Sequence, residues 1–204
     1  MASTIVSRTQ SGAESAAGRR TWTFSCWFKK SKIINGGSNQ ELFGSDSNGA
    51  RSNNYNVIDL NSNDCLDVNG YESGATFRKI TNRKFRDCNA WYHLVVAFDS
   101  TQSTADDRIK IYINGVRETS FSSSTNPSQN YSVSFYRSSA NNYVGVNNNS
   151  SDFFNGYLAE INFIDGQALD PSSFAKTNTI TGEWIPKKYT GSYGNNGYYL
   201  NFSD

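Results

Sequence analysis

The 204-residue sequence has only three cysteines and one histidine, and this scarcity excludes several classes of site. An odd number of cysteines without a Cys-x-x-Cys pair argues against a disulfide framework or a zinc site. A bridge between Cys65 and Cys88 stays open as an alternative. The single histidine, His93, leaves little room for a Ser-His-Asp arrangement. Its place within an apolar strand instead predicts a packed, hydrogen-bonded imidazole.

Excess charge and long apolar runs are also missing. The net charge is +1, with 19 basic and 18 acidic residues. This balance lacks the electrostatic footprint of a nucleic-acid-binding protein, so we expect no nucleic-acid partner. The first 20 residues have no apolar core of a signal peptide, and no later run is long enough to span a bilayer. We therefore expect synthesis in a cytosol and no membrane insertion.

Helix-forming residues are scarce, whereas aromatic and turn-forming residues are abundant. The chain contains 12 Tyr, 13 Phe and 16 Gly. Aromatic side chains favour pleated sheets, and Asn, Gly and Ser favour turns. The composition predicts an all-β fold, and the length suits a single sandwich domain over residues 1–204. Residues 1–20 would form an N-terminal arm or first strand, and residues 175–204 a closing segment.

Residues 21–30 alternate as a strand with one buried face. We expect Trp27 on the opposite, outer face, where an isolated tryptophan needs a reason. Residues 91–99 are apolar on both faces, which indicates a central strand. The core face of residues 21–30 is predicted to carry Trp22, Phe24, Cys26 and Phe28.

Turn signals divide the rest of the chain into about a dozen short strands. Asn114-Gly115 is a two-residue turn within the hairpin of residues 108–118. Asp170 and Pro171 predict the one convincing short helical turn, with Asp170 as its N-cap. Turns every 8–12 residues are typical of a two-sheet antiparallel sandwich.

Four phrases carry a resemblance to a known family. They are RRTWTFSCWFKKSK, WYHLVVAFDSTQSTADDRIKIYINGVRE, GYLAEINFIDGQALDPSSF and TGEWIPKKYTGSYGNNGYYLNFSD. Together they resemble the concanavalin A-like, laminin G-type jelly-roll domains of marine bacteriophage virion proteins, from about residue 7 to residue 204. The resemblance implies a jelly-roll sandwich that forms part of a tail fibre, capsid fibre or decoration protein.

The same resemblance implies a function and partners. We expect a non-enzymatic, lectin-like protein of the virion surface that binds host-cell carbohydrate, contacts other virion proteins and assembles as a homo-oligomer. A purely structural role, cementing capsid or fibre subunits, remains the alternative, and a polysaccharide hydrolase is a third. The resemblance also leaves calcium open as a cofactor, at one of the Asp- and Asn-rich turns.

Aromatic side chains beside amides are the candidates for binding a glycan or a partner, because recognition loops combine such groups. The C-terminal aromatics form a further group, in which Trp184 is expected to cover one end of the sandwich. The candidate binding residues are Trp27, Tyr55, Tyr71, Tyr112, Asn147, Asn149 and Asp152.

A hydrolase would need two carboxylates about 5–5.5 Å apart for retaining chemistry. Glu160 and Asp165 have the spacing of a jelly-roll hydrolase strand, but Asn162 replaces the central carboxylate. Positions 160 and 165 lie on opposite faces of a regular strand, unless a bulge intervenes. We expect no catalytic residue, with Glu160 a solvent-facing acid and Asp165 the start of an Asp-Gly turn.

Overall fold

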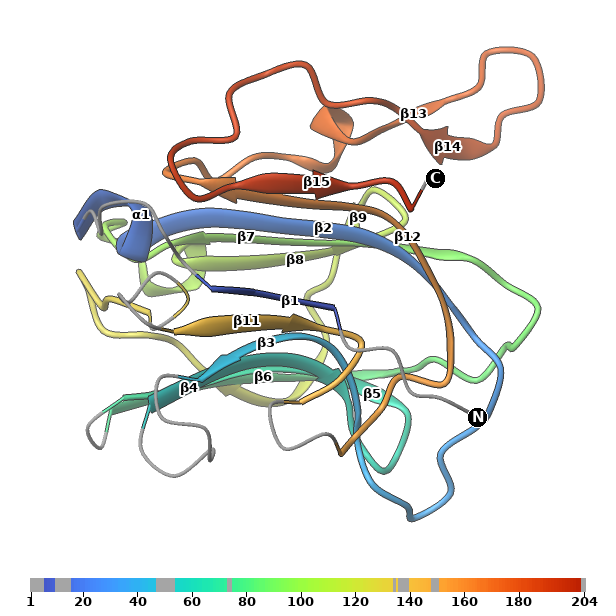
Figure 1. The fold of residues 1–204 in the computed structure, drawn as a ribbon, viewed down its shortest axis with the longest axis horizontal. Helices are drawn as coiled ribbons and strands as arrows, with labels where there is room; N and C mark the ends of the chain where they lie inside the picture. Colours follow the sequence, from blue (N-terminus) through green and yellow to red (C-terminus); the bar gives the residue numbers. More distant parts are fainter. Residues whose placement is uncertain are drawn as a thin grey trace.

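The computed structural model of the chain is an antiparallel sandwich of two large sheets, which confirms the all-β prediction. Figure 1 shows the two sheets stacked as layers, with the β13–β14 hairpin outside the upper one. The layers hold a continuous hydrophobic core between them. The structure describes residues 6–9, 16–46, 54–72, 75–133, 135, 140–147 and 151–202.

The strands number 15 in the described part of the chain, slightly more than the dozen expected. The seven-stranded sheet runs in the order β1 (Val6–Thr9), β11 (Asn141–Val144), β3 (Gln40–Asp46), β4 (Asn54–Leu60), β5 (Cys65–Glu72), β6 (Ala75–Lys84), β10 (Phe121–Thr125). The six-stranded sheet runs β15 (Tyr198–Leu200), β12 (Gly156–Asp165), β2 (Thr21–Lys30), β7 (Tyr92–Asp99), β8 (Ile109–Ile113), β9 (Val116–Arg117). The small third sheet is β13 (Ala175–Thr177) with β14 (Trp184–Pro186).

Helical turns are short but more numerous than the sequence predicted. Besides the expected turn Pro171–Ser173, the chain forms α1 (Ala16–Arg20) and a 3₁₀ turn at Ala105–Asp107. Asp170 takes the predicted N-cap position of the Pro171–Ser173 turn, but its side chain makes no capping bond and instead accepts a hydrogen bond from the Tyr112 hydroxyl at 3.2 Å. No helix in the described segments is long and apolar enough to cross a membrane.

The core face of β2 is the predicted one. Trp22, Phe24, Cys26 and Phe28 are all buried in the central cluster. The Phe24 ring stacks on Phe43 of the opposite sheet, with ring centroids 4.7 Å apart. Such offset stacking adds to the stabilisation from buried area and fixes how the two layers meet.

The outer face of the six-stranded sheet is also covered, although by a different part of the chain. Val95 and Ile164 point to this side and form a second small core with Phe174. The segment that follows β12 lies over this face (Figure 1). Its coverage explains why β7 is apolar on both faces, as expected for a central strand.

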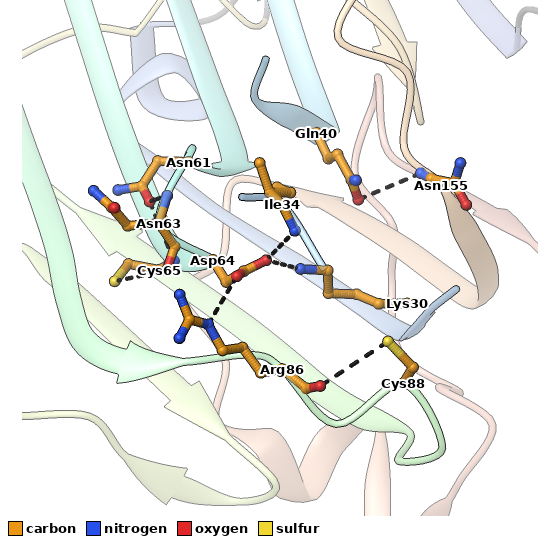
Figure 2. A network of polar contacts seen from close by, with 10 residues as sticks. All are labelled: Lys30, Ile34, Gln40, Asn61, Asn63, Asp64, Cys65, Arg86, Cys88 and Asn155. Carbon is orange, nitrogen blue, oxygen red and sulfur yellow. Dashed lines mark hydrogen bonds and ion pairs between the residues drawn. The ribbon is translucent and has the colours of Figure 1, made fainter. Parts of the chain in front are cut away.

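A buried ion pair ties the two sheets together at one end. Figure 2 shows Asp64, in the turn between β4 and β5, receiving hydrogen bonds from Lys30 at the end of β2, from Arg86 and from the backbone N–H of Ile34. Lys30 and Asp64 are fully buried. Burial alone would raise the pKa of the Asp64 carboxyl, but these donors outweigh it and hold the pKa below its usual range.

The three cysteines are free. Cys26 lies in the core, and burial raises the pKa of its thiol. Cys65 and Cys88 do not pair: their sulfurs contact the backbone carbonyls of Asn63 and Arg86 (Figure 2). The alternative of a Cys65–Cys88 bridge is therefore not the arrangement in this fold.

We expect Asp64→Asn to lower the free energy of unfolding by about 3–5 kcal/mol, because it leaves the Lys30 ammonium buried without a counter-charge. Urea unfolding of the purified protein measures this loss. Asp107→Asn removes the same charge from exposed ion pairs with Lys110 and Arg117 and should cost about 0.5 kcal/mol or less. Equal losses in the two variants would contradict the proposed importance of the buried pair.

Candidate functional site

A tryptophan-lined pocket opens on the outer face of the six-stranded sheet. Its volume is about 680 Å³, within the usual range of ligand sites. We call it the tryptophan pocket. It is lined by Trp27, Trp91, Asn114, Ala159, Glu160, Glu183, Trp184, Ile185 and Pro186.

Strand register places one wall of this pocket. Ala159 of β12 pairs with Trp27 of β2, and Trp27 pairs with His93 of β7. Asn114 extends the row, since its side-chain oxygen accepts a hydrogen bond from the backbone N–H of His93 at 2.8 Å. Trp27 therefore lies on the outer face, as predicted, but it is only 8% exposed because its neighbours cover it.

Glu160 reaches the pocket through a β-bulge in β12. The pairing of β12 with β2 shifts register between Ala159 and Asn162, and Glu160 has φ +51°. A non-glycine residue in this region costs about 1–3 kcal/mol, a strain that clusters at functional sites. The Tyr199 hydroxyl donates to Glu160 Oε2 at 2.7 Å. Burial and this bond raise the pKa of Tyr199 to about 12, so the hydroxyl stays a donor.

The single histidine holds the floor of the pocket together. His93 is fully buried and stacks on Trp27, with ring centroids 5.0 Å apart and planes at 19°. Trp184 Nε1–H donates to His93 Nδ1 at 3.0 Å. Because Nδ1 accepts, the proton of the neutral ring sits on Nε2, which donates to Ser25 Oγ at 3.0 Å. The prediction of a packed, hydrogen-bonded histidine is confirmed.

The other wall comes from the C-terminal segment. Trp184 begins β14, which pairs with β13 through Thr177. Its indole packs on the predicted Asn114-Gly115 turn, where a Cβ on Gly115 would lie 3.0 Å from the ring. Gly115 also has φ +81°, so both its conformation and the close approach require glycine. Trp184 thus covers the outer face of the six-stranded sheet, not the end of the sandwich as expected.

Tyr55 and Tyr71 lie on a different surface. They stack on the outer face of the seven-stranded sheet, with centroids 6.0 Å apart and planes at 20°. Tyr55 borders a polar groove of about 390 Å³. The polar groups of this groove bond mainly to one another: Arg78 pairs with Asp67 through Nε–Oδ2 at 3.0 Å, and Asn39 donates to Asp59 at 3.0 Å.

The remaining predicted binding residues do not join either surface. Asn147 donates to Asp152 Oδ2 at 2.9 Å, so this loop closes on itself. Tyr112 lies on the outer face as predicted, but next to Phe174 and Asp170, away from the tryptophan pocket. Asn149 lies outside the described residues.

Asp165 has no part in the pocket. Its carboxylate is buried and accepts a hydrogen bond from the backbone N–H of Asn196 at 3.1 Å. Burial raises the pKa of this carboxyl above its usual value. Glu160 bonds to Tyr199 instead, so the two acids have separate surroundings. Glu160 is half-buried in the pocket wall rather than the freely solvated acid that the sequence suggested.

The acidic turn that follows β7 bonds within the chain. Asp99 Oδ1 accepts from the Thr101 hydroxyl at 2.6 Å, and Oδ2 accepts from the Gln102 amide at 2.6 Å. Asp107 pairs with Lys110. Within the described ranges, no group of three or more His, Cys, Asp or Glu side chains is placed to hold a metal. Residues 47–50, in another of these turns, lie outside the described residues, and calcium there stays a prediction.

The sequence reasoning missed Trp91, Asn114 and Glu183 as members of one site. Trp91 carried a usable signal, because it directly precedes β7 and lies two positions before His93, so the alternation of the run puts both on one side. No sequence signal pointed to Glu183, because it lies almost 70 residues beyond Asn114 and only the tertiary structure brings the two into one pocket.

Acid should weaken the fold through His93. Burial lowers the pKa of its imidazole from 6.5 to about 4, so the unfolded chain takes up a proton first as the pH falls. The stability that neutral His93 contributes is complete above pH 6.5 and is lost as the pH falls toward 4, a loss of about 3 kcal/mol. Urea unfolding across this window measures it. His93→Gln should flatten the dependence, and an unchanged slope in that variant would contradict the assignment.

The comparisons with known proteins identify the fold family. The profile of the "Concanavalin A-like lectin/glucanases superfamily" matches residues 7–173. No curated protein matches the sequence. The pocket wall at residues 183–186 lies beyond the matched span.

Solved structures share the fold at low identity. Domain 4 of AbnA, a GH43 extracellular arabinanase from Geobacillus stearothermophilus, in complex with arabinotriose, has a TM-score of 0.53 and 21% identity over 75% of this chain and 64% of that one. The heptameric SAP-like pentraxin of Limulus polyphemus has a TM-score of 0.53 and 12% identity over 89% of this chain and 83% of that one. A putative carbohydrate binding protein from Bacteroides ovatus has a TM-score of 0.52 and 15% identity over 81% of this chain and 41% of that one.

This chain thus spans less than two thirds of the arabinanase domain and of the Bacteroides protein. At such identities the likeness establishes the fold alone. The match over residues 7–173, together with the two-sheet sandwich, decides the family. The chain belongs to the concanavalin A-like lectin/glucanases superfamily.

Proposed function

We propose that this protein binds carbohydrate without cleaving it, and that the tryptophan pocket is the binding site. The observation that carries the proposal is the convergence of Trp27, Trp91 and Trp184 on one surface pocket with two carboxylates and an amide. Sugars present apolar C–H faces and hydroxyl edges. Aromatic rings suit the faces, and a few fixed polar groups suit the edges.

Trp91 is the most accessible ring of the pocket. It is 41% exposed and lies beside Tyr157, which is 61% exposed, with ring centroids 6.5 Å apart. Neighbouring exposed aromatic side chains form an apolar patch, and such patches often mark binding sites. The pair extends the pocket into a platform on which a saccharide ring can stack.

The polar groove at Tyr55 is the weaker candidate. Its charged groups already bond to one another, so a sugar would have to break the Arg78–Asp67 pair to use them. Among relatives in fold, the arabinanase domain was solved with arabinotriose and the Bacteroides protein is named as a putative carbohydrate binding protein. These names support a saccharide ligand but do not select the surface.

The setting we propose is the surface of a bacteriophage virion, where the protein would bind a host-cell glycan as part of a homo-oligomeric fibre or decoration. The sequence resemblance to marine phage virion domains supports this setting. The alternative is a purely structural virion protein that contacts only other virion subunits. Its location on particles, distal fibre or capsid lattice, separates the two roles.

Trp91→Ala should weaken saccharide binding more than tenfold, because a well-placed tryptophan contributes about 2 kcal/mol or more at a binding hot spot. Isothermal titration with oligosaccharides from host surface polysaccharide measures this change. The loss of stability should be smaller than for a buried tryptophan such as Trp22, because Trp91 is 41% exposed.

Phe153→Ala is the matched control, because Phe153 is 38% exposed and lies outside the pocket. Loss of binding in Tyr71→Ala, with Trp91→Ala unchanged, would move the site to the other sheet. Absence of any saccharide binding by the folded protein would favour the structural role.

A further inference from the structure

The tryptophan pocket carries acidic charge and no basic charge in its lining. Glu160 and Glu183 both line it, and none of the described residues of the lining is Lys, Arg or His. The whole chain is nearly neutral, so this local excess of negative charge is a property of the pocket. An acidic sugar would enter against two carboxylates, whereas a positively charged group would be attracted.

Each carboxylate is held by one hydroxyl of the chain. Tyr199 donates to Glu160 Oε2 at 2.7 Å, and Thr181 donates to Glu183 Oε2 at 3.1 Å. Within the described part of the chain, neither Oε1 atom receives a hydrogen bond. One oxygen of each acid is thus fixed in place, and the other remains an acceptor for a ligand donor.

The tryptophans add a preference for a cation. Aromatic ring faces are electron-rich and attract cations, with tryptophan the strongest of the three aromatic residues. Trp91 is 41% exposed and is therefore open to a ligand, whereas Trp27 is only 8% exposed. The pocket therefore suits a ligand that carries both a cation and an apolar face.

The nearest basic groups lie outside the lining. Lys29 is on the outer face of β2, in register with Tyr157 of β12, beside the Trp91 platform. Lys187 follows the pocket wall, but its Nζ donates to the backbone oxygen of Ser172 at 2.9 Å. Within the described part of the chain, neither lysine forms an ion pair with Glu160 or Glu183.

We propose that the tryptophan pocket selects saccharides that carry a free ammonium group, that is, amino sugars without an N-acetyl group, over neutral and acidic saccharides. The inference rests on the proposed function, because it assumes that the pocket binds a saccharide. The ammonium would lie against the aromatic faces and bond to Glu160 and Glu183.

Three probes of equal length test this selectivity by isothermal titration: β-linked oligomers of glucosamine and of N-acetylglucosamine, and an α-linked oligomer of galacturonate. The titrations use the full chain at low salt and slightly acidic pH, where the amine is protonated. We expect the glucosamine oligomer to bind at least about tenfold more tightly than its N-acetylated counterpart, and added salt to reduce that advantage. The galacturonate oligomer should not bind.

Glu183→Gln keeps the shape of the side chain and removes its charge. This variant should weaken binding of the glucosamine oligomer about tenfold and the N-acetylated oligomer by much less, so that the preference between the two shrinks. Asp107→Asn is the control, because it removes the same charge from an exposed pair outside the pocket. A loss of equal size in Asp107→Asn would show a general charge effect and overturn the inference.

The two proposals fail in distinguishable ways. Equal affinity for the glucosamine and N-acetylglucosamine oligomers, both sensitive to Trp91→Ala, would overturn the charge selectivity and leave the proposed site standing. Tighter binding of the galacturonate oligomer than of the glucosamine oligomer would also overturn the charge selectivity and leave the proposed site standing. If no saccharide, including host polysaccharide, binds the folded protein, both proposals fail together.

Discussion

The hydrogen bond between Trp184 and His93 is the contact on which the candidate site depends. It joins the C-terminal segment to a central strand of the six-stranded sheet and fixes the Trp184 indole in the pocket wall. The bond requires a neutral imidazole with its Nδ1 free to accept. Burial ensures that state by lowering the pKa of His93, since a charged ring would be desolvated at high cost.

The bulge at Glu160 is the second constraint on the site, because it connects β12 to Tyr199 of β15 through the Glu160 side chain. A regular strand would continue the pairing with β2 and place Glu160 on the core side, where a carboxylate would lack partners. The extra residue turns the side chain outward to Tyr199 on β15. The backbone strain at φ +51° is therefore offset by a satisfied carboxylate, and it puts an acid beside three tryptophans.

Much of the fold followed from local patterns. The alternation of residues 21–30 predicted which face is buried, and Asn114-Gly115 predicted the hairpin, because each pattern depends on neighbours in sequence. The candidate site was harder to predict from the sequence. Strand alternation correctly places Trp27 on the outer face, but it does not show that Trp91 belongs to the same pocket. Asp170 takes the predicted N-cap position, but its carboxylate bonds to Tyr112, 58 positions earlier, and does not cap the turn.

The sequence by itself determined the all-β class, the inward face of β2, the packed state of His93 and the family resemblance. All of these depend on side-chain period, composition or contiguous phrases. Only the tertiary structure decided that Glu160, Glu183 and Trp184 meet Trp27 and that Tyr55 lies on the opposite sheet. The physical reason is that strand pairing and burial of the outer face join residues far apart in the chain, and no local pattern encodes that register.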